Sequence, residues 1–250
     1  MRPDKSRIEL ACAWAGVVFL ATYLIFFLAV AQWIPPHPPS WSADRVAELY
    51  QDHTTGIRIG QIGAMFASFL LFPLWALIST HIARIELARG RMPLLALIQF
   101  GCAALLQVFF VLCSMLWLVA AFRPGLSPET LRVLHDAGWL MFVMMAPGYL
   151  ILMICIGSAA FIDRSPDPVI PRWAGYFHLW VGLAGLGGSL AVFFKDGPFA
   201  WNGAVGFYIP VAVFAAWLVV ITRLLHRRAV RGEVAGHEAS LEATAEPAPV

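Results

Sequence analysis

Six stretches of the chain, each more than 20 residues long, contain no charged side chain: residues 10–34, 59–80, 92–122, 137–162, 173–194 and 197–222. A helix needs about 20 consecutive apolar residues to cross a bilayer. The composition agrees, because 60% of the residues are hydrophobic and 13% are charged, whereas a soluble domain carries about 25% charged residues. The sequence therefore predicts an all-α, polytopic integral membrane bundle of six transmembrane helices over residues 1–225, with the lipid bilayer as its surroundings.

The charge of the chain excludes one class of partner and marks its last segment. A net charge of +2 is too small to indicate nucleic acid as a partner. After the last apolar stretch, Arg227, Arg228 and Arg231 suit the anionic inner leaflet of a membrane. The residues that follow carry several glutamates and little that could form a core, so residues 226–250 are predicted to form a disordered cytoplasmic tail.

The distribution of Lys and Arg predicts the orientation, because cytoplasmic segments carry an excess of both. With the N-terminus inside, twelve of these residues fall in cytoplasmic segments: Arg2, Lys5, Arg7, Arg84, Arg89, Arg91, Arg164, Arg172, Arg223, Arg227, Arg228 and Arg231. Five fall outside: Arg45, Arg58, Arg123, Arg132 and Lys195. Both termini are therefore expected in the cytoplasm. The short loops are typical of bacterial proteins, and the expected location is a cell membrane, in bacteria the inner membrane.

The first apolar stretch has a second interpretation. Basic residues precede it and Ala29-Val30-Ala31 ends it, as in a cleavable signal peptide. The apolar run before that motif is about 19 residues, longer than the 7–15 residues usual in a signal sequence. Its length favours a retained first span.

Two predicted outer loops carry a related pattern. Ser42 and Ser127 are each followed by an acidic residue in the next two positions, and Ser at the N-cap with an acid in the first turn favours a helix start. Apolar residues four and seven positions after each serine give one apolar face. We expect two short amphipathic helices on the outer side, either as interfacial connectors or as lids over a cavity. The Lys195-Asp196-Gly197-Pro198 segment predicts a tight hairpin between the last two spans.

Several absences from the sequence restrict the function. The chain has no phosphate-binding Gly-x-x-x-x-Gly-Lys-Ser/Thr loop, no His-Glu-x-x-His motif and no Gly-x-Ser-x-Gly turn. None of the six stretches contains Asp or Glu, the usual proton carriers within membranes. We therefore expect a binding protein rather than an ATP-driven or proton-coupled transporter or an enzyme.

The third and fourth stretches contain the candidate ligand-pocket residues. They are Gln99, Gln107, Ser114, Met141, Met144 and Met145. An amide in hydrocarbon needs a partner, so the glutamines predict either hydrogen bonds between helices or a polar-lined cavity. The methionines fit a core or an adaptable ligand surface. Pro73 and Pro147 should bend the second and fourth spans.

Polar residues near the predicted outer ends of the spans are candidates for the mouth of an outward-facing site. These are His53, Arg58, His135, Asp136, Lys195, Trp201 and Asn202. The alternative is a solvated, ion-paired rim.

Two histidines allow a metal-binding interpretation. His81 and His178 lie near the cytoplasmic ends of the second and fifth stretches, at depths of about 5 and 9 Å for a rise of 1.5 Å per residue. Similar depth is what two axial ligands of haem b require. The alternative is that His81 reaches the lipid headgroups and His178 bonds a neighbouring helix.

The predicted function is to bind a small apolar or amphipathic molecule without transforming it, as a transport accessory, sensor or complex subunit. Such a chain could act with another membrane protein or as a homo-oligomer. No cofactor is required by this interpretation. The alternative is a membrane redox module linked to b-type haem or quinone, with His81 and His178 as ligands.

Overall fold

The computed structural model of the chain describes residues 3–245, and the side chains of residues 7–231; all regular structure in that part is helical. The α-helices are α1 (Pro3–Leu24), α2 (Ala43–Asp52), α3 (Thr54–Ser68), α4 (Leu71–Ala88), α5 (Leu94–Phe122), α6 (Pro128–Val143), α7 (Ala146–Ile162), α8 (Arg172–Ala184) and α9 (Ile209–Ala245). Three segments have other helical geometry: the π-helical η1 (Ile25–Val30) and η3 (Ala204–Tyr208), and the 3-10 helix η2 (Gly185–Phe193).

Six helical segments within the described residues are long and apolar enough to cross a membrane. They are Arg7–Val30, Thr54–Ala88, Leu94–Phe122, Pro128–Ile162, Arg172–Phe193 and Ala204–Arg231. Each corresponds to one of the apolar stretches of the sequence, so the predictions of an all-α chain and of six helical segments long and apolar enough to span a membrane are confirmed; we refer to these segments as spans. This architecture is compatible with a multi-pass membrane protein.

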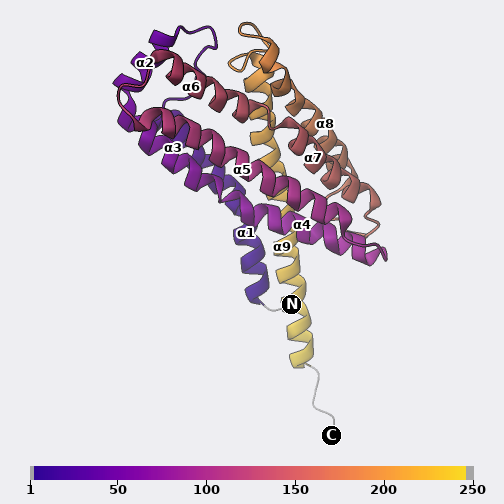
Figure 1. Cartoon of the computed structure of the whole chain (residues 1–250). Helices are drawn as coiled ribbons and strands as arrows, with labels where there is room; N and C mark the ends of the chain where they lie inside the picture. The colour runs from indigo at the N-terminus through magenta and orange to yellow at the C-terminus, as the bar shows by residue number, and fades with distance from the viewer. Residues whose placement is uncertain (1–2, 246–250) are drawn as a thin grey trace.

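The spans run alternately between two ends of the bundle. At one end, which we call the α2 end, lie α2 and the connections 123–127 and 194–203. At the other end lie the connections 89–93 and 163–171, and Figure 1 shows both chain termini on this side. We call this the arginine-rich end, because Arg84, Arg89, Arg91, Arg164, Arg172, Arg223, Arg227, Arg228 and Arg231 all belong to it.

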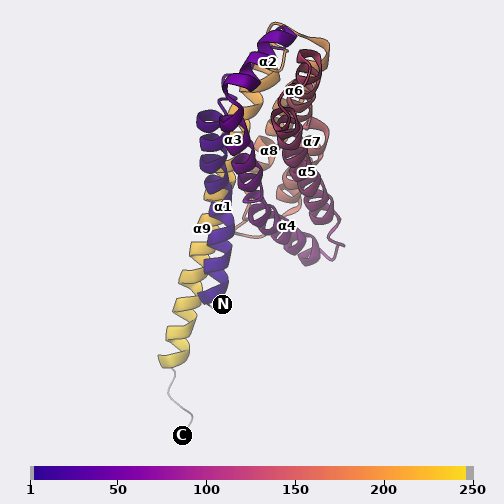
Figure 2. The same ribbon diagram turned by 60° about the vertical axis from the view of Figure 1, so that its left-hand side comes forward.

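The first and last spans are neighbours although they lie at opposite ends of the sequence. Figures 1 and 2 both show α1 alongside α9, and α1 also packs against α3 and α4. The Thr222 hydroxyl donates to the Ala13 carbonyl at 3.1 Å, and the Trp14 indole donates to His226 Nδ1 at 3.2 Å. Two hydrogen bonds therefore join the last span to the first, in addition to the packing between them.

Proline interrupts the second and fourth spans, as the sequence predicts. The second span breaks between α3 and α4, and the fourth breaks at Met144 and Met145 between α6 and α7. Pro73 and Pro147 lie in the first turn of the helix after each break. Proline is tolerated there because the first amides of a helix have no intrahelical acceptor.

The fifth and sixth spans are also irregular, at positions where the backbones approach closely. The fifth changes from α8 to η2 at Gly185, and the sixth changes from η3 to α9 just before Pro210. A Cβ atom on Gly188 would lie 2.1 Å from the Val143 carbonyl oxygen. Glycine is therefore required where η2 packs directly on the end of α6.

Two side chains of the second span bind the two ends of α5. The Glu86 carboxylate accepts the backbone N–H groups of Leu95 and Ala96 at 2.9 and 3.0 Å. The Arg58 guanidinium donates to the Ala121 carbonyl at 2.6 and 2.9 Å. A carboxylate at the N-terminus and a guanidinium at the C-terminus both complement the helix dipole and satisfy unbonded backbone groups.

The two serine-capped segments form helices of different lengths. The Ser42 hydroxyl accepts the Arg45 N–H and begins α2, a separate helix with Val46, Ala47 and Tyr50 buried. Ser127 caps its helix in the same way. The helix that it begins is the whole of α6, because the apolar pattern continues without a break to Val143.

Two further segments differ from expectation. The predicted tight hairpin is an irregular connection over residues 194–203, which folds back so that the buried Trp201 indole donates to the His37 carbonyl at 2.8 Å. The predicted disordered tail begins as helix, because α9 continues to Ala245 through a segment rich in the helix formers Ala, Glu and Leu. Residues 246–250 of the predicted tail lie outside the described residues.

Candidate ligand pocket at the helix interruptions

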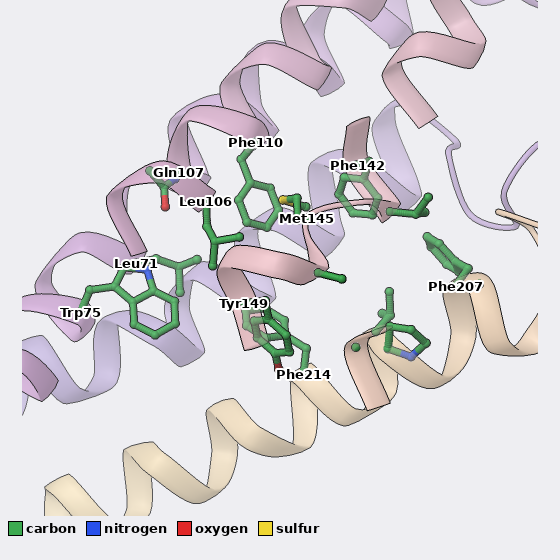
Figure 3. Close-up of a pocket in the computed structure, with 16 residues that line it drawn as sticks. Leu71, Trp75, Leu106, Gln107, Phe110, Phe142, Met145, Tyr149, Phe207 and Phe214 are labelled. Carbon is green, nitrogen blue, oxygen red and sulfur yellow. The ribbon is translucent and has the colours of Figure 1, made fainter. Parts of the chain in front are cut away.

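A pocket of about 120 Å³ is lined by residues of the second to sixth spans (Figure 3). Its walls are mainly aromatic: Trp75, Phe110, Phe142, Tyr149, Phe207 and Phe214 line it. Phe142, Tyr149 and Phe214 are only half-buried, so the pocket is partly open. Its volume is close to that of an engineered apolar cavity that binds benzene.

The pocket lies where four spans are interrupted. Leu71 comes from the break in the second span, and Val143, Met145 and Ala146 come from the break in the fourth. Gly185 and Pro210 mark the irregular points of the fifth and sixth spans. Irregular backbone at membrane depth is tolerated where protein or a cavity surrounds it. The shape of the pocket thus depends on helix geometry that continuous α-helices would not provide.

Three side chains on the pocket wall have polar atoms without a hydrogen-bond partner among the described residues. Gln107 is 2% exposed, and neither its side-chain oxygen nor its nitrogen has a hydrogen-bond partner among the described residues. The Trp75 indole N–H and the Tyr149 hydroxyl are likewise buried and unpaired within that part of the chain. Figure 3 shows Gln107, Trp75 and Leu71 on one side of the pocket and Phe142 and Phe207 on the other. Buried polar groups without partners cost free energy, and a ligand or water in the pocket would reduce that cost.

One wall of the pocket depends on a glycine. A Cβ atom on Gly185 would lie 2.7 Å from Tyr149 Cδ1. The Tyr149 ring can therefore pack this closely against η2 because Gly185 has no side chain.

The structure brings only two of the sequence-predicted pocket residues together. Gln107 and Met145 both line the pocket, whereas Gln99, Ser114, Met141 and Met144 are not among its lining residues. Gln99 accepts a hydrogen bond from the Ser79 hydroxyl, so it joins two helices. Ser114 is fully buried, and its hydroxyl has no hydrogen-bond partner within the described part of the chain.

The sequence did not indicate the aromatic residues that form the pocket walls. Trp75, Tyr149 and Phe207 belong to three different spans, and hydropathy does not indicate which spans are neighbours. The signals that could have located the pocket are Pro73, Pro147 and the glycines of the fifth stretch, because all of them accompany its helix breaks.

One candidate for the outer mouth, His135, lies in a buried aromatic cluster at the α2 end. His135 is 2% exposed, and its Nε2 accepts the Trp139 indole N–H at 3.1 Å. An indole nitrogen only donates, so the proton of a neutral His135 lies on Nδ1, which is 3.2 Å from the Tyr50 hydroxyl. His135 therefore joins α6 to α2 as a neutral imidazole.

His37 lies in the same cluster, outside the spans. Its ring stacks on Trp41 at 5.0 Å and lies 5.3 Å from the His135 ring. The pKa of His37 is lowered to about 4, mainly by burial; a backbone hydrogen bond at Gln32 opposes this change, and neighbouring His53 adds to it. His37 is accordingly neutral at pH 7.

The other outer-mouth candidates do not form one site. Arg58 binds the end of α5 and Trp201 binds His37, as described above, while His53 Nε2 donates to the Val30 carbonyl at 2.9 Å. Asp136 and Asn202 are half-buried, and Lys195 is exposed.

The two candidate haem ligands lie on different helices. His178 Nδ1 donates to the Ala174 carbonyl at 2.5 Å, and its buried Nε2 has no hydrogen-bond partner within the described chain. His81 is 5% exposed on α4. α7 packs against both α4 and α8. Among the described side chains, no group of three or more His, Cys, Asp or Glu could hold a metal ion.

The chain matches no model of a protein family, no curated protein and no solved structure.

Proposed function

We propose that the protein binds a small apolar or amphipathic molecule in the aromatic pocket and does not transform it. Such a protein would serve as a transport accessory, a sensor or a subunit of a membrane complex. The proposal includes a cell-membrane location, bacterial inner membrane in particular, with both termini in the cytoplasm and α2 on the outer side.

The unpaired amide of Gln107 carries this proposal. Within hydrocarbon, an amide that bonds neither protein nor solvent is costly, and Gln107 lies on the wall of a pocket large enough for a ligand. A bound molecule with a hydrogen-bond donor and an acceptor would satisfy both atoms of the amide.

The walls favour a flat, ring-sized group on that molecule. Aromatic side chains stack on or pack edge-on against other rings, and the volume of about 120 Å³ suits a single six-membered ring. An apolar tail would leave through the open side. A ring bearing a carbonyl or hydroxyl group would meet Gln107 at one side of the pocket.

The matched pair Gln107→Leu and Gln61→Leu tests the proposal. Gln61 is also fully buried with both side-chain polar atoms unpaired in the described structure, but it does not line the pocket. Each substitution removes an unsatisfied amide, so each should raise the melting temperature of the ligand-free protein by a few degrees. Only Gln107→Leu should weaken ligand binding, by about tenfold for the loss of two hydrogen bonds.

Native mass spectrometry of gently solubilised protein measures retained molecules, and a thermal-shift panel of ring-containing lipophiles measures binding. Equal effects of the two substitutions on binding would contradict the pocket assignment. Failure of the wild-type protein to retain or respond to any compound would contradict the proposed function itself.

A redox module is the second candidate, supported by one observation at His178. Its Nδ1–H is held by the Ala174 carbonyl, so Nε2 carries the free lone pair. Fixing one ring nitrogen in this way is usual for a metal-bound histidine. A b-type haem held by His81 and His178 would give the purified protein a sharp visible spectrum, which replacement of either histidine by alanine should abolish or alter. A colourless preparation from haem-supplemented cells would contradict it.

A further inference from the structure

A second cavity, of about 210 Å³, lies at the arginine-rich end between the α7–α8 connection and α9. Arg227, Arg228 and Arg231 line it together with Asp167, and Val169, Trp173 and Leu224 provide apolar surface. Its location is separate from the aromatic pocket, with which it shares no lining residue.

The lining of this cavity carries more positive than negative charge. Asp167 pairs with Arg231 at 2.5 Å and with Arg228 at 3.5 Å. Arg227 has no ion-pair partner among the described side chains and is exposed. Three guanidinium groups therefore face one carboxylate, which leaves an excess of two positive charges. The shared carboxylate holds two of the guanidinium groups on one side of the cavity.

The position of the cavity matches that of a membrane surface. Its basic residues follow the last uncharged stretch of the sequence, residues 197–222, on α9, and Trp173 is next to the start of the fifth span at Arg172. Trp173 is 57% exposed, and exposed tryptophan is typical of the level of lipid headgroups. Guanidinium groups bind phosphate oxygens in pairs.

We propose that this cavity binds the phosphate of an anionic phospholipid headgroup. Arg227 and Arg231 bind the phosphate oxygens, and the glycerol and first acyl segments lie against Trp173 and Leu224. Basic pockets between transmembrane helices are known to take anionic headgroups in this way. The apolar half of the cavity favours a lipid over a soluble phosphate, which would leave Trp173 and Leu224 uncovered.

Native mass spectrometry of the full-length protein in detergent, with added phosphatidylglycerol or phosphatidylcholine, tests the proposal. We expect retained phosphatidylglycerol on the wild-type protein, and binding at least tenfold weaker for Arg227→Gln/Arg231→Gln, since each basic residue near a membrane surface contributes about fivefold. Arg89→Gln/Arg91→Gln is the matched control, because both arginines are exposed at the same end but do not line the cavity. Gln107→Leu should leave phosphatidylglycerol binding unchanged.

A third variant changes binding in the opposite direction. Asp167→Asn removes the competing carboxylate and should strengthen phosphatidylglycerol binding several-fold, which a misfolded protein would not do. Equal retention of phosphatidylcholine, equal losses in the two arginine pairs, or weaker binding by Asp167→Asn would overturn the proposal. Binding of inorganic phosphate as tightly as phosphatidylglycerol would overturn the assignment to a lipid.

Discussion

At the scale of single residues, His37 couples the stability of the protein to pH. Its pKa falls from 6.5 to about 4 on burial, so the unfolded chain takes up a proton between these values and the folded chain does not. The free energy of unfolding should therefore fall as the pH drops from 6.5 to 4, by up to about 1.4 kcal/mol per pH unit, with no contribution from His37 above that range.

His37→Phe keeps an aromatic ring beside Trp41 but removes the titration. Thermal unfolding of the detergent-solubilised protein, followed from pH 7.5 to 4, should show a shallower decline for this variant. The two proteins differ only at position 37, so a difference between their declines reports the effect of that side chain. Identical declines would show that His37 is not the coupled group.

At the scale of elements, α5 depends on the second span for both of its ends. Glu86→Gln should destabilise the protein by about 1–3 kcal/mol, because an amide offers one acceptor where the carboxylate serves two N–H groups. Arg58→Gln should cost a similar amount. Each corresponds to a fall of a few degrees in melting temperature.

The exposed pair Arg45 and Glu48 provides matched controls. Their side chains are 60% and 56% exposed and 2.8 Å apart, and surface ion pairs of this kind contribute about 0–1 kcal/mol. Arg45→Gln and Glu48→Gln should therefore change the melting temperature little. Losses as large as those at Arg58 and Glu86 would show that charge alone, rather than capping of α5, determines the stability.

Elements differ in how far local sequence specifies them. The breaks at Pro73 and Pro147 were predictable, because proline lacks the N–H that a continuous helix needs. The irregular geometry at Gly185 and over η3 was not, because it depends on close approach between backbones that are distant in sequence. Glu86 shows the same limit: it lies just beyond an uncharged stretch, and its burial follows from α5 packing over it.

At the scale of the whole molecule, the number of spans was predictable and their neighbours were not. Hydropathy is a property of each stretch, whereas the pocket requires knowing that the second, third, fourth, fifth and sixth spans meet. Gln107 could be selected as a polar residue in an apolar span. Its aromatic neighbours could not, because aromatic residues occur in every span.

Orientation is a prediction for the molecule as a whole. The excess of Lys and Arg at the arginine-rich end should place that end in the cytoplasm. A reporter that is active only in the cytoplasm should be active when it is fused after Val250. A reporter that is active only after export should be active when it is inserted after Gly125, in the connection 123–127. A C-terminal reporter active on the outer side would contradict this orientation.

The packing of α1 on α9 has a consequence for biosynthesis. When α5 leaves the ribosome, the second span that supplies Glu86 and Arg58 has already been made, so the first three spans can begin to associate during synthesis. The face of α1 that contacts α9, however, stays without its final partner until the last span is inserted. Chains released from the ribosome before the last span is made would expose that face of α1 in the bilayer. Membrane proteases and chaperones could recognise such chains by the exposed face.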